Sequence, residues 1–599
     1  MEKNKLDVTQ LIGFLFLIAA FIWLFMFQPE IEDLDSTVLP ATEDFSQPER
    51  NNLENESNLN TTNFQRSKVE ELIKIENQDL RLVFSTKGAQ ITEAVLKNYN
   101  RLDGKNLKIN DANQIFSFNS DNLDTSKIYF SYDIYDNNLG KEINFFYNNE
   151  TGERITFTYF LPNNGFLLSL DVKTSGYNKL INSNSQIDLN WSLDSFQHSK
   201  SEVYENRYTY LNYQDDDEDV RDMSAYSDDD EVDSAKWVSY SQHFFNSILI
   251  FDVIKDNIEF KSFNLDKTNL NDGSNDGFNF LKSFQSKIPI TLNSRGEIEE
   301  KYEWYIGPND YYVIKDYDYG ISDSIWFGWG IFGWINQKVF FPLYKFLSSH
   351  FSSGVAIIIL VILTRLVMSP VQYKMYLSQA KMKILRPEIT AATEKFKDDP
   401  MKRQQETMKI YNQAGANPLQ GCLPAFIQLP VFYALFCFFP VAFALRGESF
   451  LWVNDLSSYH IVFELPFYIP LYGDHVSLFP ILAGLTMFIY TSMQGTQQMQ
   501  PAQPGMPNMK YIMYFIPFTL IIFFNSFAAG LSLYYTVSNI LTVIIMLTIK
   551  NVILDEKKIL LQIEENKKKP KTEGRFQRRL RKLQEAAEKA QKLQNQRNK

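Results

Sequence analysis

The sequence predicts a polytopic α-helical membrane protein with six transmembrane helices and, between the first two of them, an all-β sandwich domain. Three observations support this fold class: uncharged apolar runs near the N-terminus and after residue 350, short alternating segments between them, and basic residues gathered in two regions. A chain of 599 residues is also too long for one core, so several folding units are expected.

The first apolar run, Leu11–Phe27, follows Lys3 and Lys5. A secretory signal peptide begins in the same way, but the residues after this run lack the small side chains that a signal peptidase requires. Residues 1–27 are therefore interpreted as an uncleaved transmembrane anchor, with its N-terminus in the cytoplasm by the positive-inside rule.

Five further runs have close to the ~20 apolar residues that cross a bilayer. They are Ser352–Met368, Cys422–Leu445, Leu478–Met493, Lys510–Phe527 and Ala529–Ile549. With six spans, the basic loop 372–420 of the core 351–549 and the basic tail 550–599 both face the cytoplasm. Residues 28–350 and the loop 446–476 then lie outside.

The long segment between the first two spans has two parts that differ in composition and apolar pattern. Residues 28–69 are rich in Asn, Glu, Ser and Thr without apolar periodicity, which predicts a flexible tether. Over 70–320 short runs alternate, as at Leu80, Leu82 and Phe84, and this pattern predicts an antiparallel β-sandwich. The acidic runs at 215–219 and 228–231 favour a solvated loop; calcium binding is the alternative, although EF-hand spacing is absent.

Residues 321–350 precede the second span and predict an amphipathic helix in the outer membrane–water interface. Val339, Leu343, Phe346 and Leu347 fall on one helical face, and Trp326, Trp329 and Trp334 come before them. A linker helix packed on the sandwich is the alternative.

The loop 372–420 predicts a helical hairpin kinked near Pro387, because Met382, Leu385 and Ile389 recur at helical spacing. Its exposed basic residues are expected to include Lys374, Lys381, Lys383, Arg386, Lys402 and Arg403. Basic side chains beside a membrane suit anionic lipid or ribosomal RNA, and they also set the topology.

One charged residue, Arg365, lies inside a predicted span away from its ends. An arginine at the centre of a membrane helix costs roughly 2.5–3.5 kcal/mol, unless its side chain reaches the interface. Other polar residues occur at depth, and lipid-facing polar groups are disfavoured, so these side chains are expected to share an interior or a wet cavity. They are Gln428, Asn525, Ser526, Tyr534, Tyr535, Ser538 and Asn539.

Several function classes are disfavoured by what the sequence lacks. The spans hold no Asp or Glu, which a proton- or sodium-coupled transporter needs as a relay. The two cysteines share one apolar run and the five histidines are scattered, so no metal, cofactor or bond-making chemistry is expected. A transporter or channel, and a sugar-binding or sugar-modifying protein tethered to the membrane, remain the alternatives to the function suggested by the motifs below.

Four motifs stand out over about 340–550: Gln379–Ile389, Asn417–Pro424 followed by Gln428-Leu429-Pro430, Leu451–Leu456 and Gly530–Asn539. They resemble, in the right order, motifs of the YidC family of membrane protein insertases. Lys236-Trp237-Val238 and Ile306–Tyr311 are similar, more weakly, to the family's periplasmic domain. The Gln/Pro/Met-rich segment 497–507 departs from the family pattern.

The resemblance implies a five-helix insertase core around a hydrophilic groove that inserts and folds nascent inner-membrane proteins, alone or with the Sec translocon. Arg365 matches the groove arginine, Gln428, Tyr534 and Tyr535 fall on motif positions that border the groove, and Asn539 ends the last motif. The hairpin, with Lys381, Lys383, Arg386 and Pro387, is implied to recruit clients, and the basic tail to help dock ribosomes. Nascent membrane proteins, ribosome, Sec translocon and anionic lipids are thus the expected partners, without a small-molecule substrate.

Overall fold

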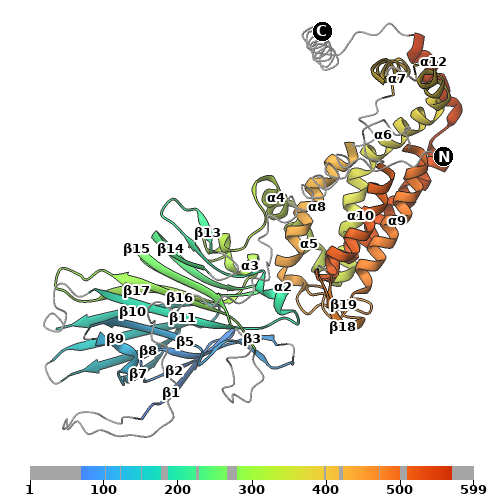
Figure 1. Cartoon of the computed structure of the whole chain (residues 1–599). Coiled ribbons are helices and arrows are strands. Elements are labelled where there is room, and N and C mark those ends of the chain that lie inside the picture. The colour runs from blue at the N-terminus through green and yellow to red at the C-terminus, as the bar shows by residue number, and fades with distance from the viewer. Residues whose placement is uncertain are drawn as a thin grey trace, which may run out of the picture.

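The computed structural model describes residues 69–568 apart from short gaps. The gaps are 102, 122, 150–151, 177–185, 224–227, 266–278, 397–399, 417–422, 471 and 499–508. The predicted anchor, almost all of the predicted tether and residues 569–599 of the basic tail lie outside the described residues. A β-rich part from the earlier half of the chain stands beside a bundle of helices from the later half (Figure 1).

The β-rich part contains two sheets whose strand pairs are antiparallel. The four-stranded sheet has the order β1 (Leu72–Glu76), β2 (Leu80–Ser85), β3 (Ile91–Asn100) and β4 (Asn106–Asp111). The 13-stranded sheet has the order β6 (Leu123–Asp124), β5 (Gln114–Ser120), β11 (Ile187–Phe196), β16 (Phe280–Ile290), β15 (Phe245–Asn264), β17 (Glu299–Pro308), β10 (Leu167–Ser175), β9 (Arg154–Pro162), β8 (Gly140–Asn148) and β7 (Ser131–Asp136). Strands β12 (Thr209–Gln214), β13 (Val220–Asp222) and β14 (Asp228–Gln242) extend it beside β15.

Alternating side chains explain why these strands bury one face. Leu80, Leu82 and Phe84 on β2 are fully buried, as the alternation predicted. The Phe84 ring packs at 4.7 Å from the Tyr159 ring of β9, so the two sheets share one core. The predicted antiparallel β-sandwich is confirmed.

The second acidic run is not a loop. Residues 228–231 begin β14, where Asp229 pairs in register with Lys261 of β15. The run belongs to a strand because Val232 and Trp237 further along β14 bury their side chains, and the pairing with β15 extends back over the acidic residues. The first run, 215–219, does lie in the connection between β12 and β13, where Asp215 pairs with Arg221 at 2.7 Å.

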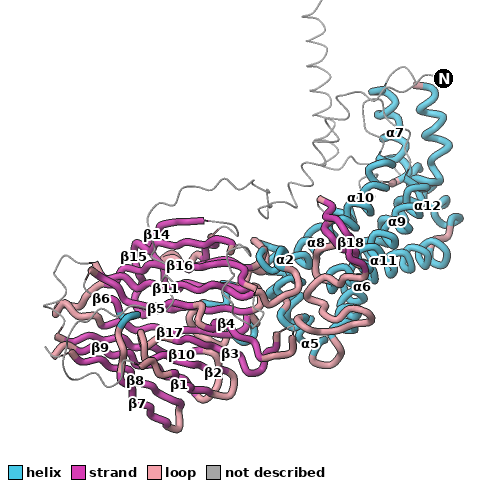
Figure 2. Tube along the Cα trace, turned by 60° about the horizontal axis from the view of Figure 1, so that its bottom comes forward, coloured by secondary structure: helices cyan, strands magenta, loops and turns pink. Residues whose placement is uncertain are grey.

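Figure 2 shows the helices gathered beside the sheets. Two short helices come from the β-rich part of the sequence, and the others follow it along the chain. The short helices are α2 (Glu202–Asn206) and α3 (Tyr311–Ile314). The others are α4 (Gly330–Ile335), α5 (Phe341–Ser348), α6 (Ser353–Lys395), α7 (Pro400–Ala414), α8 (Leu423–Val441), α9 (Leu478–Gln498), α10 (Met509–Phe524), α11 (Ala529–Thr548) and α12 (Glu556–Lys568). The π-helical turns η5 (Asn336–Phe340) and η8 (Ile549–Ile553) extend α4 and α11.

Two helical segments of the described chain are long and apolar enough, by length and composition, to cross a membrane: Ser353–Lys395 and Ala529–Ile553. Three shorter apolar segments lie beside them, at Ile427–Val441, Leu478–Met493 and Met513–Phe524. The count of six spans therefore stays a prediction.

Helix α6 is one continuous helix of 43 residues that passes through Pro370 and Pro387. The first arm of the predicted hairpin is thus the extension of the apolar helix rather than a separate element. Figure 1 shows this extension, with α7 and α12, at the end of the bundle away from the sheets.

In the segment from α4 to α5, the side chains predicted to form one apolar face are divided between buried and exposed positions. Leu347 is buried, whereas Phe346 is 62% exposed and Val339 is 42% exposed. Phe341 packs inward at 4.9 Å from the Phe438 ring of α8. Val339 lies inside the π-helical turn, which alters the rotation per residue, and the adjacent Phe346 and Leu347 point about 100° apart on α5. The side chains therefore divide between the bundle and the surface.

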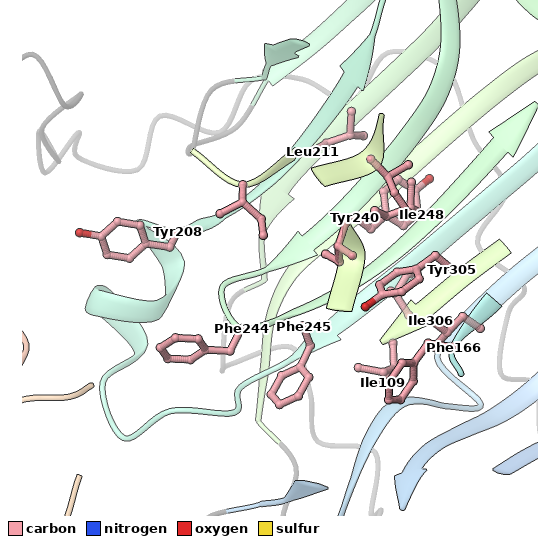
Figure 3. Packing of buried hydrophobic residues seen from close by; sticks show 14 of the residues in the cluster. Ile109, Phe166, Tyr208, Leu211, Tyr240, Phe244, Phe245, Ile248, Tyr305 and Ile306 are labelled. Carbon is pink, nitrogen blue, oxygen red and sulfur yellow. The ribbon is translucent and has the colours of Figure 1, made fainter. Parts of the chain in front are cut away.

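The two parts of the molecule meet at η7 (Phe443–Leu445), just after α8. The Phe443 ring lies 5.5 Å from Tyr99, 5.8 Å from Phe244 and 5.9 Å from Phe245. Figure 3 shows Phe244 and Phe245 at this edge of the β-rich core, with Tyr305 and Phe166 nearby.

Polar contacts accompany these rings. Arg446 lies over the Phe245 ring at 4.8 Å and donates to the Asn100 carbonyl oxygen at 2.9 Å. His243 Nε2 donates to the Pro440 carbonyl oxygen, also at 2.9 Å. One continuous hydrophobic cluster therefore runs from the sheets into the helices.

Candidate functional site

A polar cluster lies where α6, α8 and α11 meet, and Arg365 is its centre. The Arg365 side chain donates from Nε to Ser538 Oγ at 2.7 Å, and its Nη2 also contacts that oxygen. Its Nη1 donates to Gln428 Oε1 at 3.3 Å. Arg365 keeps only 8% exposure, so one cation ties three apolar helices together from the inside.

No carboxylate among the described residues forms an ion pair with Arg365. Its hydrogen-bond partners are a neutral hydroxyl and a neutral amide, which leave the guanidinium charge uncompensated. A buried cation without an anion is costly, and an approaching anionic or polar group lowers that cost. The charge of the cluster therefore favours the approach of a negatively charged or polar group.

The two tyrosines of α11 lie in different surroundings. Tyr534 OH meets Thr364 Oγ1 at 3.1 Å, one residue before Arg365, and so borders the cluster. Tyr535 packs on Phe432 of α8 and Phe524 of α10, with ring centroids 5.1 and 5.3 Å away, and its hydroxyl donates to the Phe432 carbonyl oxygen at 3.4 Å. Tyr535 thus belongs to an aromatic wall rather than to the polar contacts of Arg365.

Two asparagines that were expected to share the polar interior of the bundle do not contact Arg365 in the described structure. They bind other segments instead. Asn539 Nδ2 donates to the Ala483 carbonyl oxygen at 3.1 Å and to Thr486 Oγ1 at 3.4 Å, both on α9. Asn525 is fully buried at the end of α10 and holds the loop before α9. Of the predicted groove residues, the structure brings Arg365, Gln428 and Tyr534 together, with Tyr535 beside them, and leaves Asn539 on another contact.

Two glutamines on α6, Gln372 and Gln379, are polar residues that the sequence reasoning missed. They are 5% and 2% exposed, and three of their four side-chain polar atoms have no hydrogen-bond partner in the described structure: Gln372 Oε1 and both amide atoms of Gln379. They follow Arg365 at steps of seven residues, so all three side chains share one face of α6. This spacing was the signal in the sequence that could have found them.

The predicted recruitment residues lie on the part of α6 that forms the first arm of the hairpin. Lys383 is exposed and forms an ion pair with Glu556 of α12 at 3.4 Å, and Arg386 and Pro387 are exposed. Lys381 is partly buried, and this burial lowers the pKa of its ammonium group.

Helix α12 also packs on the hairpin. Ile559 and Ile563 of α12 are buried against Leu385 and Ile389 of α6 and against Tyr411 of α7. Lys567 of α12 forms an ion pair with Glu388 at 2.7 Å, and Asn566 Nδ2 donates to the Ala414 carbonyl oxygen at 3.3 Å. The hairpin is therefore a three-helix unit.

Two family models together match most of the chain. The model described as "60Kd inner membrane protein" matches residues 342–557, and the one described as "YidC periplasmic domain" matches residues 72–342. A curated relative from Parabacteroides distasonis, named membrane protein insertase YidC, is 32% identical over 86% of this chain and 83% of its own length. The chain belongs to the YidC family.

Other YidC relatives agree with this assignment. The membrane protein insertase YidC of Amoebophilus asiaticus is 32% identical over 85% of both chains, and that of Bacteroides fragilis is 30% identical over 83% of this chain and 81% of its own. As a YidC family member, the chain is an inner-membrane insertase of membrane proteins, and its β-rich part is the family's periplasmic domain. The YidC family is not a known enzyme family.

Among solved structures, a putative mutarotase from Salmonella typhimurium aligns with 41% of this chain and 92% of its own at 7% identity and a TM-score of 0.26. At that score the likeness carries no argument.

Proposed function

We propose that the polar cluster around Arg365 is the place where the polar segment of a nascent membrane protein leaves water during insertion. The observation that carries this proposal is the uncompensated charge of Arg365, whose hydrogen-bond partners among the described residues are Ser538 and Gln428. Carboxylates or backbone carbonyls of a client can replace these neutral partners, so the desolvation cost of moving a hydrophilic segment falls without any ATP.

Gln372 and Gln379 extend this site toward the end of α6 that carries the hairpin. Gln379 lies 14 residues beyond Arg365, which corresponds to about 21 Å along a helix. Unpartnered amides at that spacing offer successive hydrogen bonds to a peptide backbone, so the three side chains form a polar path. The cluster is closed in this structure, and the client's polar groups would displace Gln428, whose 3.3 Å contact is the longest hydrogen bond of Arg365.

The topology that goes with this mechanism has six spans with both termini in the cytoplasm, and residues 70–320 form the periplasmic domain. Clients approach from the hairpin, where Lys381, Lys383, Arg386 and Pro387 receive them, and the basic tail 550–599 docks the ribosome. Short clients are inserted by the protein alone, and larger ones beside the Sec translocon. Anionic lipids bind the exposed basic side chains of the hairpin.

The test compares Arg365→Lys with Arg365→Ala in liposomes that contain the full-length protein. A short single-span client is translated in their presence, and protection of its translocated tail from protease is scored. We expect Lys to retain insertion and Ala to reduce it about tenfold or more, chiefly for clients with acidic tails, because one hydrogen bond to a charged group contributes roughly 1.5–3 kcal/mol.

Val367→Ala is the matched control, because Val367 is 78% exposed two residues along the same helix. Equal insertion by the Lys and Ala variants would remove the charge from the mechanism. No protection with the unchanged protein would show that it does not insert this client without partners.

A further inference from the structure

The loop between α8 and α9 carries an exposed apolar hairpin. Strands β18 (Phe463–Ile469) and β19 (Gly473–Val476) pair only with each other. Phe463, Phe467 and Tyr468 are 60%, 61% and 69% exposed, and Val462 beside them is 55% exposed. These side chains project from a two-stranded ribbon rather than packing into the core.

The exposed apolar side chains of this hairpin indicate that another surface or medium covers them. An isolated two-stranded hairpin is marginally stable in water, and contiguous exposed apolar side chains mark an interaction site. Neighbouring residues on β18 point to opposite faces, and Phe467 and Tyr468 are both exposed, so β18 is open on both faces, whereas His475 of β19 is buried. A flat protein partner would cover one face of β18, whereas a fluid apolar medium surrounds both.

Strand β19 and the turn before it are tied to the ends of two apolar helices. Asn525, at the end of α10, donates from Nδ2 to the carbonyl oxygens of Tyr472 and His475 at 2.9 and 2.7 Å. Its Oδ1 accepts from the backbone N–H of Ser477 at 2.9 Å, immediately before α9. The His475 ring stacks on Tyr459 at 4.1 Å. These contacts hold the ribbon level with the end of the bundle that faces the β-rich part (Figures 1 and 2).

The segment that contains the hairpin has few charged residues. No Lys or Arg occurs between Arg446 and Lys510, and the hairpin carries only Glu464 and Asp474 as ionised groups. Nucleic acid or an acidic partner is thereby disfavoured. Phe and Tyr side chains with few charges suit the region between lipid headgroups and acyl chains, where aromatic residues gather in membrane proteins.

We propose that the β18–β19 hairpin is an anchor that inserts Phe463, Phe467 and Tyr468 into the outer leaflet of the membrane. The occupant around β18 is the interface of a phospholipid bilayer. This inference rests on the proposed topology, in which the ends of α9 and α10 next to the hairpin face the periplasm. It does not depend on Arg365 or on insertion activity.

The experiment places a nitroxide spin label at Tyr468→Cys in the full-length protein, after Cys422→Ala and Cys437→Ala remove the natural thiols. The protein is reconstituted into vesicles of phosphatidylethanolamine and phosphatidylglycerol. Collisions of the label with oxygen, which concentrates in the bilayer, are compared with collisions with a water-soluble nickel chelate. Leu139→Cys in the β-rich part, 76% exposed, is the aqueous control, and Val367→Cys on α6, 78% exposed, is the membrane control.

We expect the oxygen-to-nickel ratio at position 468 to be several-fold higher than at 139 and lower than at 367. A ratio at 468 equal to that at 139 overturns the proposal. Shielding of 468 that arises only in native membranes would assign the hairpin to a protein partner and would also overturn it.

A membrane-impermeant maleimide applied to intact spheroplasts tests the topology separately. Leu139→Cys should react, and Lys558→Cys on α12 should not. Reaction at both positions would contradict the topology, whereas the collision ratio at 468 alone decides the hairpin.

Discussion

Arg365, Gln372 and Gln379 place three polar side chains on the buried face of α6. A buried amide with no hydrogen-bond partner costs about 1–3 kcal/mol, so the helix pays for Gln379 in stability. Unsatisfied polar groups in native structures call for an explanation, and the client binding that we propose would provide one.

Replacing Gln379 by leucine separates these two effects. We expect Gln379→Leu to raise the thermal unfolding midpoint, because an apolar side chain of similar size removes the unsatisfied amide. The same variant should lower insertion of clients with polar tails. Unfolding followed by intrinsic fluorescence and the protease-protection assay measure the two quantities, with Ser369→Leu, at a half-exposed position on α6, as the control.

A second residue-scale prediction concerns pH at the junction between the two parts of the molecule. Burial, reinforced by Arg446, lowers the pKa of His243 to about 4, although its hydrogen bond to Pro440 acts the other way. Unfolding restores an ordinary pKa of about 6.5, so the unfolded chain binds the proton first as the pH falls. The stability contributed by neutral His243 is therefore present above pH 6.5 and is lost as the pH falls toward 4.

His243→Asn should remove this term, and asparagine tolerates the positive φ of 58° at this position. Between pH 7 and pH 5 we expect the unfolding free energy of the unchanged protein to fall by about 2 kcal/mol more than that of the variant. Denaturant unfolding at the two pH values measures it. His198, whose pKa burial lowers to about 3, and Glu205, whose pKa burial raises to about 7, stay the same in both proteins and cancel from the comparison. Parallel pH curves would contradict the assignment to His243.

At the scale of elements, α12 changes how the hairpin is understood. The hairpin is one arm of α6, the helix α7 and the helix α12, joined by a small apolar cluster. Because α12 belongs to the basic tail 550–599, a force on the rest of that tail would reach the hairpin through this cluster.

Ile563→Asp tests whether α12 holds the hairpin. Ile563 is 4% exposed, and a buried carboxylate without a partner costs roughly 3–5 kcal/mol, so α12 should leave the hairpin. We expect faster amide hydrogen exchange over 405–416 in this variant. Leu561→Asp is the matched control, because Leu561 is 61% exposed on the opposite side of the same helix. Unchanged exchange with Ile563→Asp would show that the hairpin is stable alone.

At the scale of the whole molecule, the β-rich part is attached to the bundle through rings rather than through the polar cluster. Phe443 and Arg446 contact the sheets, whereas Arg365 contacts only helices. The attachment and the proposed client site are thus separate in space and in chemistry.

Deleting residues 70–320 should therefore keep insertion of a short single-span client and support growth. It should lower the thermal stability of the bundle, because the deletion uncovers Phe443 and removes its ring contacts. Complementation and the protease-protection assay measure function, and adding Phe443→Ser to the deletion should recover solubility in detergent. Loss of insertion with a folded bundle would assign the β-rich part a direct role.

Much of the fold could be predicted because it depends on local periodicity. Alternation at Leu80, Leu82 and Phe84 predicts a strand with one buried face, and the apolar run at 352–368 predicts a helix. Local pattern misleads where pairing overrides it: the acidic residues 228–231 read as loop, yet β15 supplies them with a partner strand.

The candidate site was predictable in part for the same reason. Arg365 stands out as a charge in an apolar run, but the run does not say what it binds, and Ser538 lies 173 residues away. In the sequence, Asn539 and Asn525 are amides in apolar runs, just as Gln428 is. Only the folded structure shows that Asn539 binds α9 and that Asn525 binds the β18–β19 hairpin.

The sequence by itself determined the β-sandwich, the apolar helices, the unusual cation and, through its motifs, the YidC family. The tertiary structure decided which polar groups meet: Arg365 with Ser538 and Gln428, α12 with the hairpin, and the β18–β19 ribbon with Asn525. The physical reason is that burying one face of an element imposes a short repeat on the chain. The partner of a buried polar group depends instead on which distant segments pack together, and no short repeat encodes that choice.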